Sequence, residues 1–167
     1  NNLIEDVAEY VSSFIVHNNE IIINNKLTAK KFAEGYLQTD ETEWSAPLEV
    51  ALHQILADAL KIALDEHIIT EQDLFEDDIF VYNKLKQSGN ANIQKKLDML
   101  NPNIKITDNP DDYDFHSRNK LRYIDPKFLN PDGSVERVTD AYPDFYDILS
   151  KHKKWIEKGN FIKIVSY

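Results

Sequence analysis

Histidines are the residues of this chain best suited to acid–base catalysis or metal binding. The chain has five of them, His17, His53, His67, His116 and His152. None is followed by Asp, and no two stand one helical turn apart, the spacing that brings two imidazole rings onto one metal ion. We therefore expect these histidines at helix ends and on the surface. We expect no catalytic residue and no metal ligand among them.

Carboxylates gather in two stretches, Asp73–Asp78 and Asp108–Asp114. A calcium-binding loop needs carboxylates at alternate positions, a central glycine and a closing glutamate. Neither stretch has the glycine or the closing glutamate. We interpret both stretches as solvated loops and helix caps, with Asp77 suited to a helix N-terminus.

Covalent and cofactor chemistry lack their usual motifs. The chain contains no cysteine, which excludes disulfides, thiolate nucleophiles and cysteine-bound zinc or iron–sulfur sites. No Gly-x-Ser-x-Gly motif and no glycine-rich phosphate-binding loop occurs. We therefore expect no cofactor in this chain.

A group of basic residues stands in the second half of an acidic chain, and we call it the basic island: Arg118, Lys120, Arg122 and Lys127. If residues 120–124 form a strand, Arg118, Lys120 and Arg122 alternate and share one face. Three neighbouring cations repel one another unless carboxylates or an anion lie between them. One interpretation is internal pairing with residues 108–114 or with Asp125. The other is a contact with a phosphate or nucleotide through the bidentate geometry of arginine.

The overall charge limits the partners of the chain. With 19 basic and 29 acidic residues the net charge is −10, which disfavours nonspecific nucleic-acid binding and anionic membranes. No run approaches the roughly 20 apolar residues of a membrane span. The absence of cysteine suits a reducing compartment, so we expect a cytoplasmic protein. The first residues, Asn1-Asn2-Leu3-Ile4-Glu5, lack a methionine and a signal pattern, and we interpret the chain as an excised piece of a longer one.

Apolar periodicity predicts a mostly helical first part. Spacings of three and four from Ile4 to Ile15 indicate a helix over residues 3–17, and a β-branched run indicates a strand over 20–24. The longest apolar helix is expected over 48–64, after Pro47. Its apolar residues wrap more than one face, so we expect it to be the buried centre, with Leu56 inside it. Further helices are expected over 28–38, 78–88 and 91–100.

The pattern changes after Pro102, where residues 103–114 are polar and acidic. Strands are expected over 120–124 and 134–138, on either side of the turn signal Pro131-Asp132-Gly133. A helix over 140–158 should end at Gly159, and a strand over 161–165 closes the chain. We predict an α+β fold. Its parts are a helical region over 1–101 with one short strand and a small α/β lobe over 102–167, which could also form one continuous domain.

The segment Lys120-Leu-Arg-Tyr-Ile-Asp-Pro126, with the turn, Val-Thr segment and helix that follow, resembles the carboxy-terminal portion of bacterial HD-superfamily phosphohydrolases. The resemblance is to members of the deoxynucleoside triphosphate triphosphohydrolase type. Upstream, the order of the helix over 48–64, then Ile69–Leu74, then Asp77-Asp78 resembles the helical region after the catalytic core of that family. The resemblance covers nearly the whole chain as a pattern of elements.

The resemblance implies that this chain is not the catalytic part. The family uses a divalent metal held by spaced histidines and an adjacent His-Asp pair, and this chain contains no His-Asp dipeptide. The metal site would lie in a missing amino-terminal part. This chain would then assemble, cover or regulate that site within a homo-oligomer, and would be inactive alone.

Two other interpretations remain open. The chain could be a stand-alone module that binds an anion or nucleotide through the basic island, or a structural domain that binds proteins through an apolar helical face. The residues upstream of Asn1 distinguish these cases. A His…His-Asp…Asp pattern there supports the phosphohydrolase, and a natural start near Asn1 supports the other two.

Overall fold

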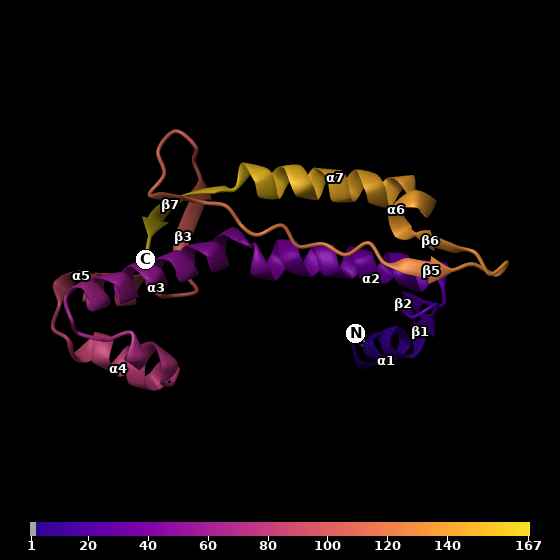
Figure 1. The fold of residues 1–167 in the computed structure, drawn as a ribbon. Coiled ribbons are helices and arrows are strands. Elements are labelled where there is room, and N and C mark those ends of the chain that lie inside the picture. Colours follow the sequence, from indigo (N-terminus) through magenta and orange to yellow (C-terminus); the bar gives the residue numbers. More distant parts are fainter. Residues whose placement is uncertain (1–2) are drawn as a thin grey trace. The chain divides into compact units, whose positions relative to one another are not determined.

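The computed structural model describes residues 3–167 of the 167-residue chain, with side-chain surroundings from Val7 onward (Figure 1). Expectations that rest on the first two residues or on the Ile4 side chain lie outside this described part. The described residues form an α+β fold, as predicted from the sequence. None of the described helices is long and apolar enough to cross a membrane.

The elements of the described part follow one another closely. The helices are α1 (Leu3–Ser13), α2 (Lys26–Thr39), α3 (Pro47–Asp65), α4 (Asp78–Gln87), α5 (Ala91–Met99), α6 (Val138–Ala141) and α7 (Pro143–Lys158). A π-helix, η1, covers Asp40–Trp44, and a 3₁₀ helix, η2, covers Gln72–Phe75. The strands are β1 (Phe14–His17), β2 (Glu20–Ile23), β3 (Lys105–Asp108), β4 (Phe115–Ser117), β5 (Lys127–Leu129), β6 (Val135–Arg137) and β7 (Asn160–Ser166).

The chain folds into two compact units, each assembled from distant stretches of sequence. Unit 1 comprises Asn1–Trp44 and Arg118–Gly159, and unit 2 comprises Ser45–Ser117 and Asn160–Tyr167. The chain therefore passes between the units three times, after residues 44, 117 and 159. The boundary expected at residue 102 falls inside unit 2.

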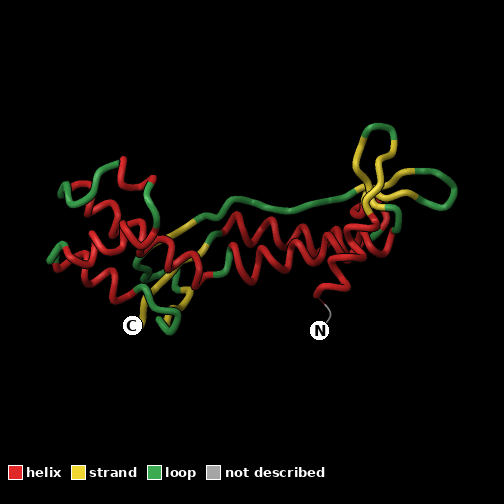
Figure 2. The backbone as a smooth tube through the Cα atoms, turned by 90° about the horizontal axis from the view of Figure 1, so that it is seen from below, coloured by secondary structure: helices red, strands yellow, loops and turns green. Residues whose placement is uncertain are grey.

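Unit 1 contains a sheet with the strand order β1-β2-β5-β6. The hairpin of β1 and β2 turns at Asn18 and Asn19, which take φ angles of 49° and 64°. Asparagine tolerates this left-handed conformation, which two-residue hairpin turns require. β2 pairs in parallel with β5 at Ile23 and Phe128, and β5 pairs with β6 in a second hairpin. Figure 2 shows both hairpins as yellow strands closed by green turns.

The core of unit 1 lies between α2, α7 and this sheet. Asn25 caps α2 by accepting hydrogen bonds from the backbone N–H groups of Leu27 and Thr28. The core residues are Ile23, Ala29, Ala33, Leu37, Phe128, Val138, Phe145 and Leu149. Small alanines on α2 allow the close approach of the bulky α7 side chains, and Figure 1 shows α2 and α7 running side by side.

Unit 2 packs α3 against α5 and against a sheet with the order β3-β7-β4. Both pairings in this sheet are antiparallel, with β7 in the centre. α3 buries a stripe of mostly small residues at helical spacing, namely Val50, Ala51, Ile55, Ala59 and Ala63. Two clusters cover this stripe, one around Ile93 and Leu97 and the other around Met99 and Ile104.

Most of the predicted elements are confirmed, but the helix expected over 3–17 is too long. It ends at Ser13, and Phe14–His17 forms β1. The β-branched residues of β1 pair with β2 across the Asn18-Asn19 turn, and this pairing overrides a helical spacing that is also present in the sequence. Val7 and Val11 of α1 are exposed and do not belong to the core of unit 1.

The strand predicted over 120–124 is wrong. Residues 118–126 make no ladder with any described strand, and the strand in this region is β5, a few residues later. Residues 118–126 instead run as an extended segment along α2 and α7 (Figure 1), held by side chains. The sequence did not predict β3 and β4, because apolar and polar residues alternate only weakly along them. Both strands pair with β7, which lies far away in the sequence.

Candidate functional site

The basic island lies entirely in unit 1, but its residues have different surroundings. Arg118 and Lys120 are exposed on the extended segment, and Arg122 is half-buried there. Lys127 is the first residue of β5. The predicted common strand face for Arg118, Lys120 and Arg122 is therefore not formed, since the strand itself is absent.

Two cations of the island have partners inside unit 1. The guanidinium of Arg122 lies 3.6 Å from Asp40 Oδ1, and it also donates a hydrogen bond to the carbonyl of Lys120. Lys127 Nζ donates to Glu20 Oε2 on β2, and this hydrogen bond lowers the pKa of Glu20. Within unit 1, the partners of Arg122 and Lys127 are therefore Asp40 and Glu20 rather than Asp125.

Asp125, one of the partners expected for the basic island, instead forms hydrogen bonds with Thr139. Its carboxylate accepts hydrogen bonds from the backbone N–H of Thr139 at 3.0 Å and from the Thr139 hydroxyl at 2.7 Å. It also lies 4.0 Å from the guanidinium of Arg137. Asp125 thus fastens the end of the extended segment to the first turn of α6, where a carboxylate satisfies free N–H groups.

A buried charged cluster lies next to Arg122, and the sequence did not predict it. His152 of α7 has both ring nitrogens beside carboxylates of η1: Nδ1 is 3.1 Å from Glu41 Oε1, and Nε2 is 3.1 Å from Asp40 Oδ2. The contact with Glu41 is aligned as a hydrogen bond, whereas the contact with Asp40 is close but not aligned as one. The side chains of His152 and Asp40 are fully buried. The expectation that all the histidines lie at helix ends or on the surface is therefore wrong for His152.

The buried members of this cluster have polar neighbours from other segments of unit 1. Asp40 lies beside His152 and beside the guanidinium of Arg122, and His152 lies between Asp40 and Glu41. Buried charges of this kind are tolerated where each one has an opposite charge within contact distance.

A signal for His152 was present in the sequence. Phe145, Leu149, His152 and Ile156 follow one another at spacings of four, three and four residues. This spacing places His152 on the buried face of α7. Its partners could not be foreseen, because Asp40 and Glu41 stand more than a hundred residues earlier in a stretch whose polarity suggested only a break between helices.

The cluster has no features of a metal centre. Within the part of the chain that the structure describes, no group of three or more His, Asp or Glu side chains is arranged to hold a metal ion. What the cluster does is connect three segments of unit 1. Its contacts join η1 to α7 and to the extended segment, at the point where α2 passes into a π-helix.

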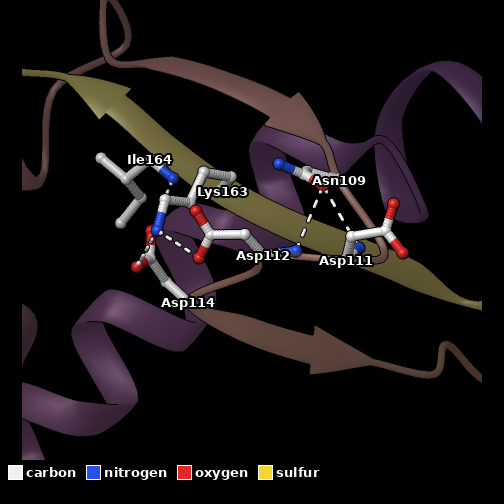
Figure 3. Close-up of polar contacts among 6 residues, drawn as sticks. All are labelled: Asn109, Asp111, Asp112, Asp114, Lys163 and Ile164. Atoms are coloured by element: carbon white, nitrogen blue, oxygen red, sulfur yellow. Dashed lines mark hydrogen bonds and ion pairs between the residues drawn. The ribbon is translucent and has the colours of Figure 1, made fainter.

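The acidic stretch Asp108–Asp114 folds back on β7 in unit 2. Figure 3 shows Asp112 and Asp114 beside Lys163, whose Nζ lies 2.9 Å and 3.4 Å from their carboxylates. Asp114 also accepts a hydrogen bond from the Ile164 N–H, and Asn109 Oδ1 accepts from the N–H groups of Asp111 and Asp112. The hydrogen bond to Asp112 raises the pKa of Lys163 despite its partial desolvation. These carboxylates shape a loop, as predicted.

The other carboxylate stretch also supplies caps, as predicted. Asp77 accepts a hydrogen bond from the Phe80 N–H at the start of α4. Asp73 and Thr70 exchange hydrogen bonds across the first turn of η2. Lys84 Nζ lies 2.8 Å from Asp73, and this contact lowers the pKa of Asp73.

Comparison with known proteins finds a similar protein that is described as uncharacterized. No protein family and no solved structure matches the chain. It is 27% identical over 168 residues to the uncharacterized protein YdhJ of Bacillus subtilis (strain 168). The alignment covers 97% of this chain and 50% of YdhJ, so the chain spans about half the length of that relative.

Proposed function

We propose that this chain is the non-catalytic carboxy-terminal region of an HD-type metal-dependent phosphohydrolase that acts on nucleotides or other phosphate esters. In this proposal the chain assembles, covers or regulates a catalytic part elsewhere in the same protein. That protein is cytoplasmic and forms a homo-oligomer. The catalytic part holds the divalent metal.

The observation that carries this proposal concerns the segment Lys120–Pro126, which resembles the family. Its charged residues Arg122 and Asp125 make contacts within unit 1. Arg122 faces the buried Asp40, and Asp125 caps α6. Both side chains therefore connect elements of unit 1 and stabilise its shape. Charged groups held in such contacts are typical of a structural role. A catalytic group, in contrast, needs access to the substrate.

Two further observations support an accessory role. The chain has no His-Asp dipeptide, the motif that the resembled family uses to hold its metal. YdhJ, the relative found by comparison, is about twice as long as the matched region, which leaves room for another part. Both observations fit a chain whose chemistry is supplied elsewhere.

Activity assays on two forms of the protein test the proposal. The 167-residue chain and the full-length product of its gene are incubated with nucleoside triphosphates and Mn²⁺, Mg²⁺ or Co²⁺. We expect hydrolysis by the full-length product only. Turnover by the chain alone, above a metal-only blank, would contradict the proposal. So would a full-length sequence without a His…His-Asp…Asp pattern upstream of Asn1.

The second candidate is an anion- or nucleotide-binding module, and the exposure of Arg118 and Lys120 favours it. A nucleotide that binds the folded chain raises its melting temperature. The gain in stability is about 2.7 kcal/mol at a hundredfold excess over Kd. Lys120→Ala should abolish this rise, and Lys86→Ala, on the exposed side of α4, should not. A nucleotide panel without any shift at millimolar concentration would exclude this module.

A further inference from the structure

An apolar surface of unit 2 is exposed to solvent around α4. Over residues 74–82, Phe75 is 83% exposed and Ile79 is 73% exposed, and Leu74, Phe80 and Tyr82 are also exposed. Single exposed apolar residues are normal on protein surfaces, but a contiguous group marks a site of interaction. Burial of these side chains by a partner would be favourable, because apolar surface would leave water.

The scaffold beneath this surface is well ordered by hydrogen bonds. The exchange between Thr70 and Asp73 fixes η2, and Asp77 caps α4. Lys84 pairs with Asp73 and lies over the Phe80 ring at 4.8 Å. Leu85 of α4 is buried in the core of unit 2. The exposed side chains therefore project from a helix that is anchored in that core.

The surface is hollowed into a groove between α3 and α4, which we call the α4 groove. It has a volume of about 530 Å³ and an apolar floor that includes Leu56, Leu60, Ile79 and Tyr82. The charged residues that line it, Glu76 and Asp78, are both acidic. An apolar floor with a one-sided charged rim is the form of a groove that receives an amphipathic helix.

We propose that the α4 groove binds an apolar helical segment with flanking Lys or Arg residues, contributed by the remainder of the longer protein to which this chain belongs. The proposal rests on the proposed function only in taking the chain as part of a longer protein. Charge complementarity selects this occupant, because basic flanks would face Glu76 and Asp78. A second copy of the same groove would place these acidic residues against each other, and like charges in contact are costly.

The length of the relative is consistent with such an occupant. The matched region is 50% of YdhJ, so a protein of that length has as much chain outside this region as within it. A contact within one polypeptide needs less intrinsic affinity than one between separate chains, because the effective concentration is high. A groove of this size can therefore remain filled in the full-length protein.

Hydrogen exchange tests the proposal on the full-length gene product and on the 167-residue chain. In the full-length protein, we expect amides of residues 74–82 to exchange about tenfold or more slowly than in the isolated chain, because docking adds protection. Ile79→Ser should remove this difference without lowering the melting temperature of the isolated chain, since Ile79 is 73% exposed. The matched control is Ile21→Ser on β2, where Ile21 is 75% exposed, and it should leave the difference intact.

Charge reversal at the rim gives a second readout. Glu76→Lys with Asp78→Lys should also abolish the slow exchange of residues 74–82, because basic flanks of the occupant would then be repelled. Equal exchange rates in the full-length protein and the isolated chain would overturn the proposal. A concentration-dependent protection of the isolated chain, lost in Ile79→Ser, would assign the groove to a second copy instead. A gene product with no residues beyond this chain would also overturn it.

These outcomes are separate from those of the proposed function. The groove can be occupied in a full-length protein that hydrolyses no phosphate ester, in which case the proposed function fails alone. Conversely, an active phosphohydrolase whose residues 74–82 exchange freely refutes the docking proposal alone.

Discussion

At the scale of single residues, Asp40 is a buried carboxylate whose compensation comes from neighbouring side chains. The side chains of Asp40 and His152 are fully buried, and Asp40 also lies 3.6 Å from the guanidinium of Arg122. Such a cluster can stabilise less than an apolar replacement of the same shape would, yet the loss of one member leaves a charge without compensation. We therefore expect the free energy of unfolding to fall when a single member of the cluster is replaced.

We predict that His152→Leu lowers the free energy of unfolding by about 1–3 kcal/mol, because Asp40 and Glu41 lose the imidazole that lies 3.1 Å from each of their carboxylates. The matched control is His53→Leu, at an exposed position of α3, which should change it by less than about 0.5 kcal/mol. Urea unfolding of both variants measures the difference. Equal midpoints for the two variants would show that the stability of unit 1 does not depend on the contacts of the His152 ring.

A second residue-scale prediction concerns Asp58 in unit 2. Burial raises the pKa of Asp58, but hydrogen bonds from Lys96 and Gln54 outweigh this, so its pKa falls below the ordinary value of 3.8. A depressed pKa contributes stability that is fully present above the unfolded-state value and is lost as the pH falls through the folded-state value. Asp58→Asn should therefore flatten the loss of stability below about pH 4. Urea midpoints measured from pH 6 to pH 2 give the comparison, and parallel curves for the two proteins would contradict it.

At the scale of elements, α3 is the buried helix of unit 2, but its faces are not equivalent. Ile55 is 1% exposed and lies in the core, whereas Leu56 is 37% exposed and lines the α4 groove. The expectation that Leu56 is buried was therefore wrong. The apolar residues wrap around α3 because one face meets the core and another meets the groove.

We predict that Ile55→Ala lowers the free energy of unfolding by about 2–5 kcal/mol, because it leaves a cavity in the core. Leu56→Ala should cost the isolated chain about 1 kcal/mol or less, since much of that side chain is already in water. Both values come from the same chemical denaturation experiment. A larger cost for Leu56→Ala than for Ile55→Ala would show that the groove is closed in the isolated chain.

At the scale of the whole molecule, each unit needs segments from both halves of the sequence. In unit 1, β2 pairs with β5 and α2 packs against α7, across more than a hundred residues. In unit 2, β3 and β4 pair with β7 at the carboxy-terminal end. A cut near residue 101 would therefore separate partners in both units.

We predict that a fragment of residues 1–101 shows no cooperative unfolding transition, whereas the full 167-residue chain does. The fragment lacks β5 and α7 of unit 1 and the whole β3-β7-β4 sheet of unit 2. Circular dichroism during a urea titration measures the transition. A sharp transition for the fragment, similar to that of the full chain, would mean that the first hundred residues form a domain of their own.

The sequence alone was sufficient for the features that depend on near neighbours. Helical spacing and caps located α3, α4, α5 and α7, and Pro131–Gly133 marked the hairpin turn. The α+β class followed from the order of these elements. Local signals suffice here because caps, turns and apolar faces act over a few residues.

Only the tertiary structure decided which distant residues meet. The basic island was visible as a set of charges, but its partners Asp40 and Glu20 were not. The cluster of His152 joins segments from both halves of the chain, and the strands β3 and β4 depend on β7, more than forty residues later. Pairing and burial are properties of long-range packing, and a polar residue shows its role only when its surroundings are known.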